Sequence, residues 1–209
     1  WKALTLDPNQ DNGLAWWTAR ERDHGGESAY VAALEKVAAL PDSWRATLWL
    51  GAQHLKDGDV DGAMTRFRSV LAQGAYDSAT LLTISGNLGN AGLITELVQL
   101  VAPHYNPATH APQTGLNLVQ AYLHLDRLDE AEALLDRLYA LDMPPFKSHL
   151  DTMAAKLQGC RRASSHARPL DEDALEIAQL TFELPIWMYG LRDPEWLFTH
   201  KPTDACKVL

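Results

Sequence analysis

Residues 44–75, WRATLWLGAQHLKDGDVDGAMTRFRSVLAQGA, decide the fold of this chain. Apolar residues recur at helical spacing on both sides of the polar turn at residues 56–59, which predicts two antiparallel helices. Gly51 and Ala63 are small, as two helices require where they cross closely, and Phe67 is bulky enough to fill the space beside them. The stretch therefore predicts a helical hairpin.

The hairpin pattern repeats along the chain at a constant interval. Ala29, Ala63 and Leu97 are equivalent positions in successive units, and the equal spacing between them in the sequence is the period of the repeat. Residues 114–141 have the same layout as the first hairpin, and Ala131 follows Leu97 by one more period. Four matched units result, at residues 10–43, 44–77, 78–111 and 112–145. One period matched in four units is hard to produce by chance.

This pattern resembles the tetratricopeptide repeat, a unit of about 34 residues that forms two antiparallel helices, with a small residue early in each helix and a proline near its end. Units 44–77 and 112–145 match it well, whereas Trp17 and Leu97 stand where the other two units should carry small residues. The resemblance implies an all-α fold, a right-handed superhelical array of helical hairpins, or α-solenoid. An armadillo-like array is the alternative.

The residues outside the four units are assigned by their own patterns. Residues 1–9 resemble the end of a second helix, so we expect them to be part of a preceding repeat. After a Pro-Pro break, residues 146–158 have one apolar face and should form a helix that caps the array, which then spans residues 10–158. We interpret residues 159–209 as a linker, a short helix and an aromatic, proline-rich tail, which either packs along the array or starts another domain.

Charge and hydropathy exclude several classes of partner. The net charge of -9 argues against a general affinity for nucleic acid or an anionic membrane, because phosphate binding needs clustered Lys and Arg. One compact basic cluster, Arg161, Arg162 and Arg168 with His166 nearby, is interpreted as part of a solvated linker. No apolar run approaches the ~18–20 residues that a membrane span requires.

Motifs for catalysis and for metal or cofactor binding are absent from the sequence. Residues 86–92, GNLGNAG, have glycines spaced as in a phosphate loop but follow no predicted strand, so we assign them to the repeat. Residues 57–61, DGDVD, begin like a calcium loop, yet Arg68 occupies the position where such a loop needs Glu. Cys160 and Cys206 cannot build a zinc site by themselves, and the sequence leaves open whether they form a disulfide. A chain of this size needs no disulfide framework, which favours a reducing compartment such as the cytoplasm over the bacterial periplasm. We expect no enzyme, no cofactor and no metal.

In the family that this chain resembles, the first helices of stacked hairpins line a concave groove, and the resemblance carries its register over to this chain. In this register Leu14, Leu48, Leu82 and Leu116 lie one period apart along the groove, and we call these four residues the leucine ladder. Polar and apolar residues lie beside them. The candidate partner-binding residues are Leu14, Thr18, Leu48, Trp49, Ala52, Leu55, Leu82, Leu116, Asn117, Gln120 and Leu123. An apolar ladder suits an amphipathic helix or an extended apolar peptide. The alternative, which the sequence leaves open, is that the leucines pack between neighbouring hairpins.

One variant of the family grips a C-terminal carboxylate with Lys, Asn and Arg at fixed groove positions. Those positions correspond here to Leu14, Thr18, Trp49, Gln113 and Asn117, so the basic residues are missing. The resemblance therefore argues against a clamp for acidic tails.

We expect a non-catalytic scaffold that binds an apolar or amphipathic peptide segment of a protein partner in its groove. The alternative is a sensor or substrate-docking arm of a larger enzyme or signalling protein. A third hypothesis is that residues 187–198, which are rich in aromatic residues, occupy the groove of the same molecule or of a second copy in a homo-oligomer.

Overall fold

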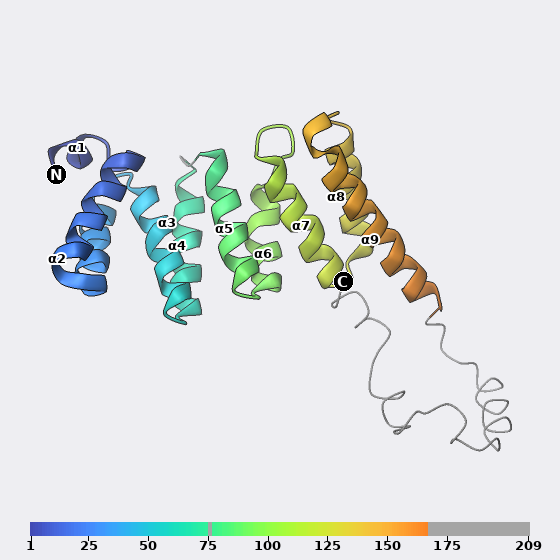
Figure 1. Cartoon of the computed structure of the whole chain (residues 1–209), viewed down its shortest axis with the longest axis horizontal. Helices are drawn as coiled ribbons and strands as arrows, with labels where there is room; N and C mark the ends of the chain where they lie inside the picture. The colour runs from blue at the N-terminus through green and yellow to red at the C-terminus, as the bar shows by residue number, and fades with distance from the viewer. Residues whose placement is uncertain (75–76, 167–209) are drawn as a thin grey trace, which may run out of the picture.

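The computed structural model describes residues 1–74 and 77–166, and these residues contain helices and turns but no strand. Helix pairs stand side by side in a row from the N-terminus to the last described helix (Figure 1). The elements are α1 (Lys2–Leu6), α2 (Asp11–Ala38), α3 (Trp44–Lys56), α4 (Val60–Gln73), α5 (Ser78–Asn90), α6 (Ile94–Val101), η1 (Ala102–His104), α7 (Pro112–His124), α8 (Leu128–Tyr139), η2 (Pro144–Phe146) and α9 (Lys147–His166). The expected array of helical hairpins is thereby confirmed.

The period found in the sequence reappears in the helix boundaries. The first helices α3, α5 and α7 begin at Trp44, Ser78 and Pro112, so each begins one period after the one before it. The second helices α4, α6 and α8 are spaced in the same way. Aspartate N-caps start two of these helices, α4 and α5. In α4 the Asp59 carboxylate accepts the backbone N–H of Gly62 at 2.9 Å, and in α5 the Asp77 carboxylate accepts the backbone N–H of Thr80 at 2.9 Å.

Each of these three hairpins turns on a residue with a left-handed backbone. Gly58, Gly92 and Asp126 occupy equivalent positions in successive units and have φ angles of 80°, 73° and 57°. Gly adopts this conformation without steric cost, and Asp tolerates it better than most residues. The amide of the following residue then closes the first helix, as when Asp59 N–H donates to the His54 carbonyl at 2.8 Å.

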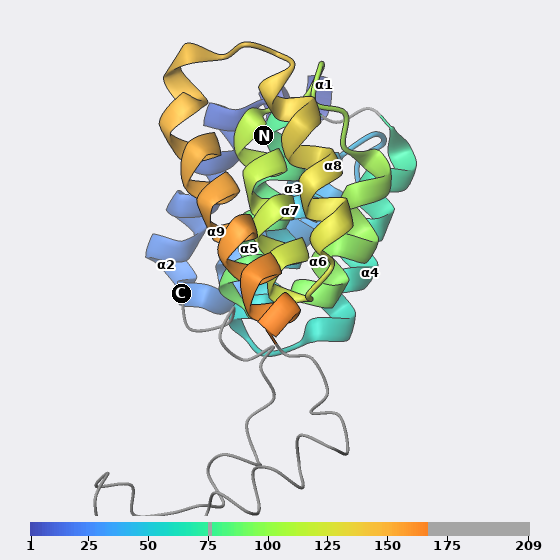
Figure 2. The ribbon, with the colours of Figure 1, turned by 90° about the vertical axis from the view of Figure 1, so that its right-hand side faces the viewer.

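The hairpins form two layers of helices (Figure 2). In that end-on view α5, α7 and α9 lie on one side, and α4, α6 and α8 lie on the other. Within the first layer α3 contacts α5, α5 contacts α7, and α7 contacts α9. The core fills the space between the layers, and Phe67 of α4 is fully buried against Gly51 of α3. This close crossing is the one that the small residue at position 51 predicted.

The first unit departs from the others. α2 is one long element broken at Gly26, where φ of 70° and ψ of -160° leave the helical region, and the break divides it into two helices. Leu14 before the break and Leu34 after it are fully buried in one apolar cluster with Leu4 of α1. Trp16 near the start of α2 is 66% exposed, so it does not anchor the core.

The last described helix corrects one expectation. The sequence predicted a helix over residues 146–158 and a linker from residue 159, but α9 continues to His166. Leu157 and Cys160 keep the helix on the core, and the Arg161 guanidinium forms ion pairs with Asp129 and Glu132 of α8. Arg161 is therefore part of the array, whereas Arg168 lies outside the described residues.

Candidate interaction groove

The structure divides the leucine ladder and the residues beside it into buried and accessible residues. Leu14, Leu48 and Leu123 are 0%, 3% and 2% exposed, so their side chains pack in the core. Thr18 is also buried, and its hydroxyl donates to the Leu14 carbonyl at 2.8 Å within α2. In this structure none of these four side chains is accessible to a partner.

The other candidates are half-buried and lie at several places along the first-helix layer. They are Trp49, Ala52, Leu55, Leu82, Leu116, Asn117 and Gln120. Leu116, Asn117 and Gln120 of α7 line concave surface, where the structure brings them together with residues of two neighbouring helices. Trp49, Ala52, Leu55 and Leu82 lie outside those hollows.

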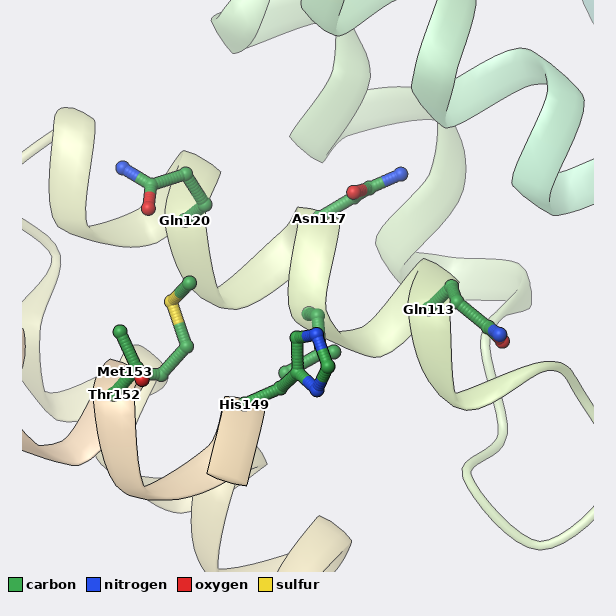
Figure 3. A pocket seen from close by; sticks show the side chains of 7 residues that line it. Gln113, Asn117, Gln120, His149, Thr152 and Met153 are labelled. Carbon is green, nitrogen blue, oxygen red and sulfur yellow. The ribbon is translucent and has the colours of Figure 1, made fainter. Parts of the chain in front are cut away.

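Two adjoining hollows flank α7. The α7–α9 hollow has a volume of about 330 Å³ and is lined by Gln113, Leu116, Asn117, Gln120, His149, Thr152 and Met153. The α5–α7 hollow has a volume of about 220 Å³ and is lined by Ser85, Gly86, Gly89, Asn90, Ile94, Leu97, Asn117, Gln120, Ala121 and His124. Asn117 and Gln120 belong to both, so we treat the two hollows as one groove across α5, α7 and α9. Figure 3 shows the α7 amides beside His149, Thr152 and Met153 of α9.

Hydrogen bonds to neighbouring helices orient the two shared amides. The Ser85 hydroxyl donates to the Leu82 carbonyl at 3.0 Å, so its oxygen accepts Asn117 Nδ2 at 3.0 Å. Lys156 Nζ can only donate, and it donates to Gln120 Oε1 at 3.3 Å. Asn117 Oδ1 and Gln120 Nε2 have no hydrogen-bond partner among the described residues. The groove thus presents a free acceptor and a free donor one helical turn apart on α7.

The described residues that line the groove carry no formal charge, and the Lys156 ammonium contacts Gln120 at its edge. No Lys, Arg, Asp or Glu is among the residues that line either hollow in the described part of the chain. Leu116 and Met153 supply apolar surface beside the amides. The lining is therefore uncharged, and it combines apolar surface with the two side-chain amides.

Sequence reasoning missed the α9 side of the groove. His149, Thr152 and Met153 lie on one side of α9 at helical spacing and flank the buried Leu150. Leu150 follows Leu116 by one period, so extending the register by one more helix would have pointed to α9 as a further first helix. The register alone would not have identified which of its residues face the groove.

The segments that resembled a phosphate loop and a calcium loop in the sequence have structural roles. Gly86 and Gly89 lie inside the helix α5, so residues 86–92 do not form a phosphate loop. The Asp59 carboxylate caps α4 and contacts His54 Nδ1 at 2.8 Å, and the backbone N–H of Gly62, followed by His54, lowers the pKa of Asp59. In residues 1–74 and 77–166, no group of three or more His, Cys, Asp or Glu residues is placed to hold a metal ion.

Comparison with known proteins identifies one segment. A sequence model of the tetratricopeptide repeat matches residues 112–137, which comprise α7 and most of α8. No curated protein and no solved structure matches the chain. No described helix combines the length and apolar character needed to cross a membrane. The chain therefore contains a tetratricopeptide repeat at the centre of its groove.

Proposed function

We propose that this chain is a non-catalytic interaction scaffold whose groove across α5, α7 and α9 binds an uncharged, extended segment of a protein partner. Tetratricopeptide repeats typically serve protein–protein interaction, and the repeat at residues 112–137 supplies the middle helix of the groove. The fold class alone does not select a ligand, so the proposal depends on the groove itself.

The oriented amides carry this proposal. An extended peptide offers an N–H and a C=O along its edge, and Asn117 Oδ1 and Gln120 Nε2 can accept the first and donate to the second. Because Ser85 and Lys156 already hold these amides, little side-chain entropy is lost when a peptide binds. Leu116 and Met153 beside them would cover an apolar side chain of the peptide.

The groove residues that the structure describes carry no formal charge, and this limits which peptide side chains the groove can accept. A buried carboxylate or ammonium needs a partner of opposite charge, and no charged residue lines either hollow among the described residues. The Lys156 ammonium at the edge of the groove already donates to Gln120. An uncharged segment with aliphatic or aromatic side chains has no such requirement. We therefore expect the scaffold to prefer uncharged peptides over acidic or basic ones.

A peptide array tests the proposal. The probes are immobilised extended peptides in three sets, which are uncharged and apolar, rich in Asp and Glu, or rich in Lys and Arg. The intact chain should bind the uncharged set most tightly. The double variant Asn117→Ala, Gln120→Ala should bind that set about tenfold or more weakly, because each lost hydrogen bond contributes ~0.5–1.5 kcal/mol.

A matched control separates the groove from the rest of the surface. Gln99 is an exposed amide on α6, in the opposite layer, so Gln99→Ala should leave binding unchanged. Far-ultraviolet circular dichroism should show the same helicity for all three chains. Equal binding by the double variant, or a preference for charged probes, would exclude the groove as the binding site for uncharged segments.

A further inference from the structure

We infer that residues 184–191 of the same chain, LPIWMYGL, are the resident occupant of the groove, an inference that rests on the proposed function. These residues lie beyond α9, outside the described part of the chain. Binding of an external partner would then require displacement of this segment, which makes the scaffold self-inhibited.

The chemistry of the segment matches the groove. It is the longest stretch after α9 without a charged side chain, bounded by Glu183 and Arg192. Pro185 has no N–H and disfavours a helix through this point, and it biases Leu184 toward extended backbone. The segment thus lacks charged side chains and contains a proline that disfavours a helix, two sequence properties that suit the uncharged, amide-bearing groove.

The chain leaves α9 at the end of the groove. The helices α5, α7 and α9 run in the same direction (Figure 1), and the α5–α7 hollow is lined by the C-terminal halves of α5 and α7. The end of α9 at His166 therefore lies toward the same end of the helices as most of the residues that line the α5–α7 hollow. A segment that follows α9 can turn back and enter the groove from this end.

The length of the connection is sufficient. From His166 to Leu184 the chain can span up to about 60 Å at ~3.3 Å per residue. The groove residue farthest from His166 on α9 is His149, which lies about 25 Å back along the helix at ~1.5 Å per residue. The entropy of closing such a loop grows only slowly with its length, so the spare length costs little.

A displacement experiment on the intact chain tests this inference. The probe is a fluorescent peptide that copies residues 183–192, and its binding is measured by anisotropy. A tethered segment acts at an effective concentration on the order of millimolar, so it should weaken binding of a free copy with a dissociation constant of ~10–100 μM by about 10- to 100-fold. The full-length variant Ile186→Asp, Trp187→Asp, whose segment no longer suits the groove, should bind the probe more tightly by that factor.

The outcomes separate this inference from the proposed function. Trp196→Asp is the matched control, because it places the same substitution at a Trp outside the segment, and it should bind the probe as weakly as the wild type. Equal binding of the probe to the wild type and the Ile186→Asp, Trp187→Asp variant would overturn self-occupancy and leave the groove proposal standing. No binding to either chain would also overturn self-occupancy. The peptide array, repeated in the Ile186→Asp, Trp187→Asp background so that no tethered segment competes, then judges the groove independently.

Photo-crosslinking locates the segment directly. A benzoylphenylalanine at position 113, which lines the α7–α9 hollow, should crosslink the full-length chain to a proteolytic peptide that contains residues 184–191. The yield should not depend on protein concentration, because the two groups belong to one molecule. A yield that rises with concentration would instead show a segment from a second copy and would refute self-occupancy, as would crosslinks to other peptides alone.

Discussion

Two glycines inside first helices should respond oppositely to alanine. Gly51 lies in α3, and a Cβ added there would stand 2.5 Å from Cε1 and 2.7 Å from Cδ1 of Phe67, a ring that is 0% exposed. Gly86 lies in α5, and a Cβ added there would meet no atom within 4 Å. The same substitution therefore tests the close hairpin crossing at one position and the open groove wall at the other.

The expected magnitudes combine two opposing effects. Alanine in a helix interior is more favourable than glycine by about 1 kcal/mol, because glycine loses more backbone entropy on folding. Gly86→Ala should therefore raise the free energy of unfolding by up to about 1 kcal/mol. At Gly51 the added methyl also overpacks the core, which costs ~1–3 kcal/mol. Two ring carbons lie closer than 3.0 Å and the ring is enclosed, so we expect the upper part of that range and a net loss of about 1–2 kcal/mol.

Urea unfolding followed by circular dichroism measures both effects, as shifts in midpoint at constant slope. Phe67→Leu provides an internal check, because it removes Cε1, the ring carbon nearest the new methyl, and replaces the rigid ring with a more adaptable side chain. In a double-mutant cycle Gly51→Ala should cost less in the Phe67→Leu background than in the wild type. The crossing geometry is refuted if Gly51→Ala proves as stable as Gly86→Ala, or if its cost is the same in both backgrounds.

Three further predictions concern burial, pH and the end of the array. Leu48→Asp should lower the free energy of unfolding by at least the ~2–5 kcal/mol that truncating a buried leucine costs, and it should reduce the helicity measured by circular dichroism. Leu116→Asp changes a half-buried groove position and should retain the wild-type spectrum. Similar spectra for both variants would contradict the burial of Leu48. The pKa of Asp59 is held below its ordinary value of 3.8, chiefly by the backbone N–H of Gly62, so its ionised form stabilises the fold above that pH and the effect is lost as the pH falls. The urea midpoint of the wild type should exceed that of Asp59→Asn, which keeps a capping side chain, and the gap should close in acid; a gap independent of pH would disprove the charge effect. Arg161→Ala should speed amide hydrogen exchange in the last turns of α9, and added salt should reduce the difference from the wild type; unchanged exchange would show that its ion pairs with α8 do not hold the helix end.

The hairpins were predictable because their signals are local. The turn at Gly58 needs a left-handed residue and a polar N-cap after it, and both are visible in the Asp57-Gly58-Asp59 sequence. The small residue at Gly51 and the bulky Phe67 indicated a close crossing before any coordinates were known. The recurrence of this pattern at a constant period then predicted the order and type of the helices up to α8.

The groove was only partly predictable, because helical register does not by itself reveal burial. Leu48 and Leu116 occupy equivalent register positions, yet Leu48 is buried in the core and Leu116 lines the groove. The difference arises from how each helix packs against its neighbours, which depends on residues far away in the sequence. The end of α9 was mispredicted for the same reason, since the ion pairs of Arg161 join it to Asp129 and Glu132 in the preceding helix.

The amino-acid sequence by itself determined that this protein is an array of helical hairpins, because turns, caps and apolar spacing act within a few residues of one another. Only the tertiary structure decided which side chains form its surface for a partner. Asn117 and Gln120 are ordinary polar residues in the sequence, and contacts with Ser85 of α5 and Lys156 of α9 orient them as a free acceptor and a free donor. That orientation requires three helices to meet, so no local pattern could encode it.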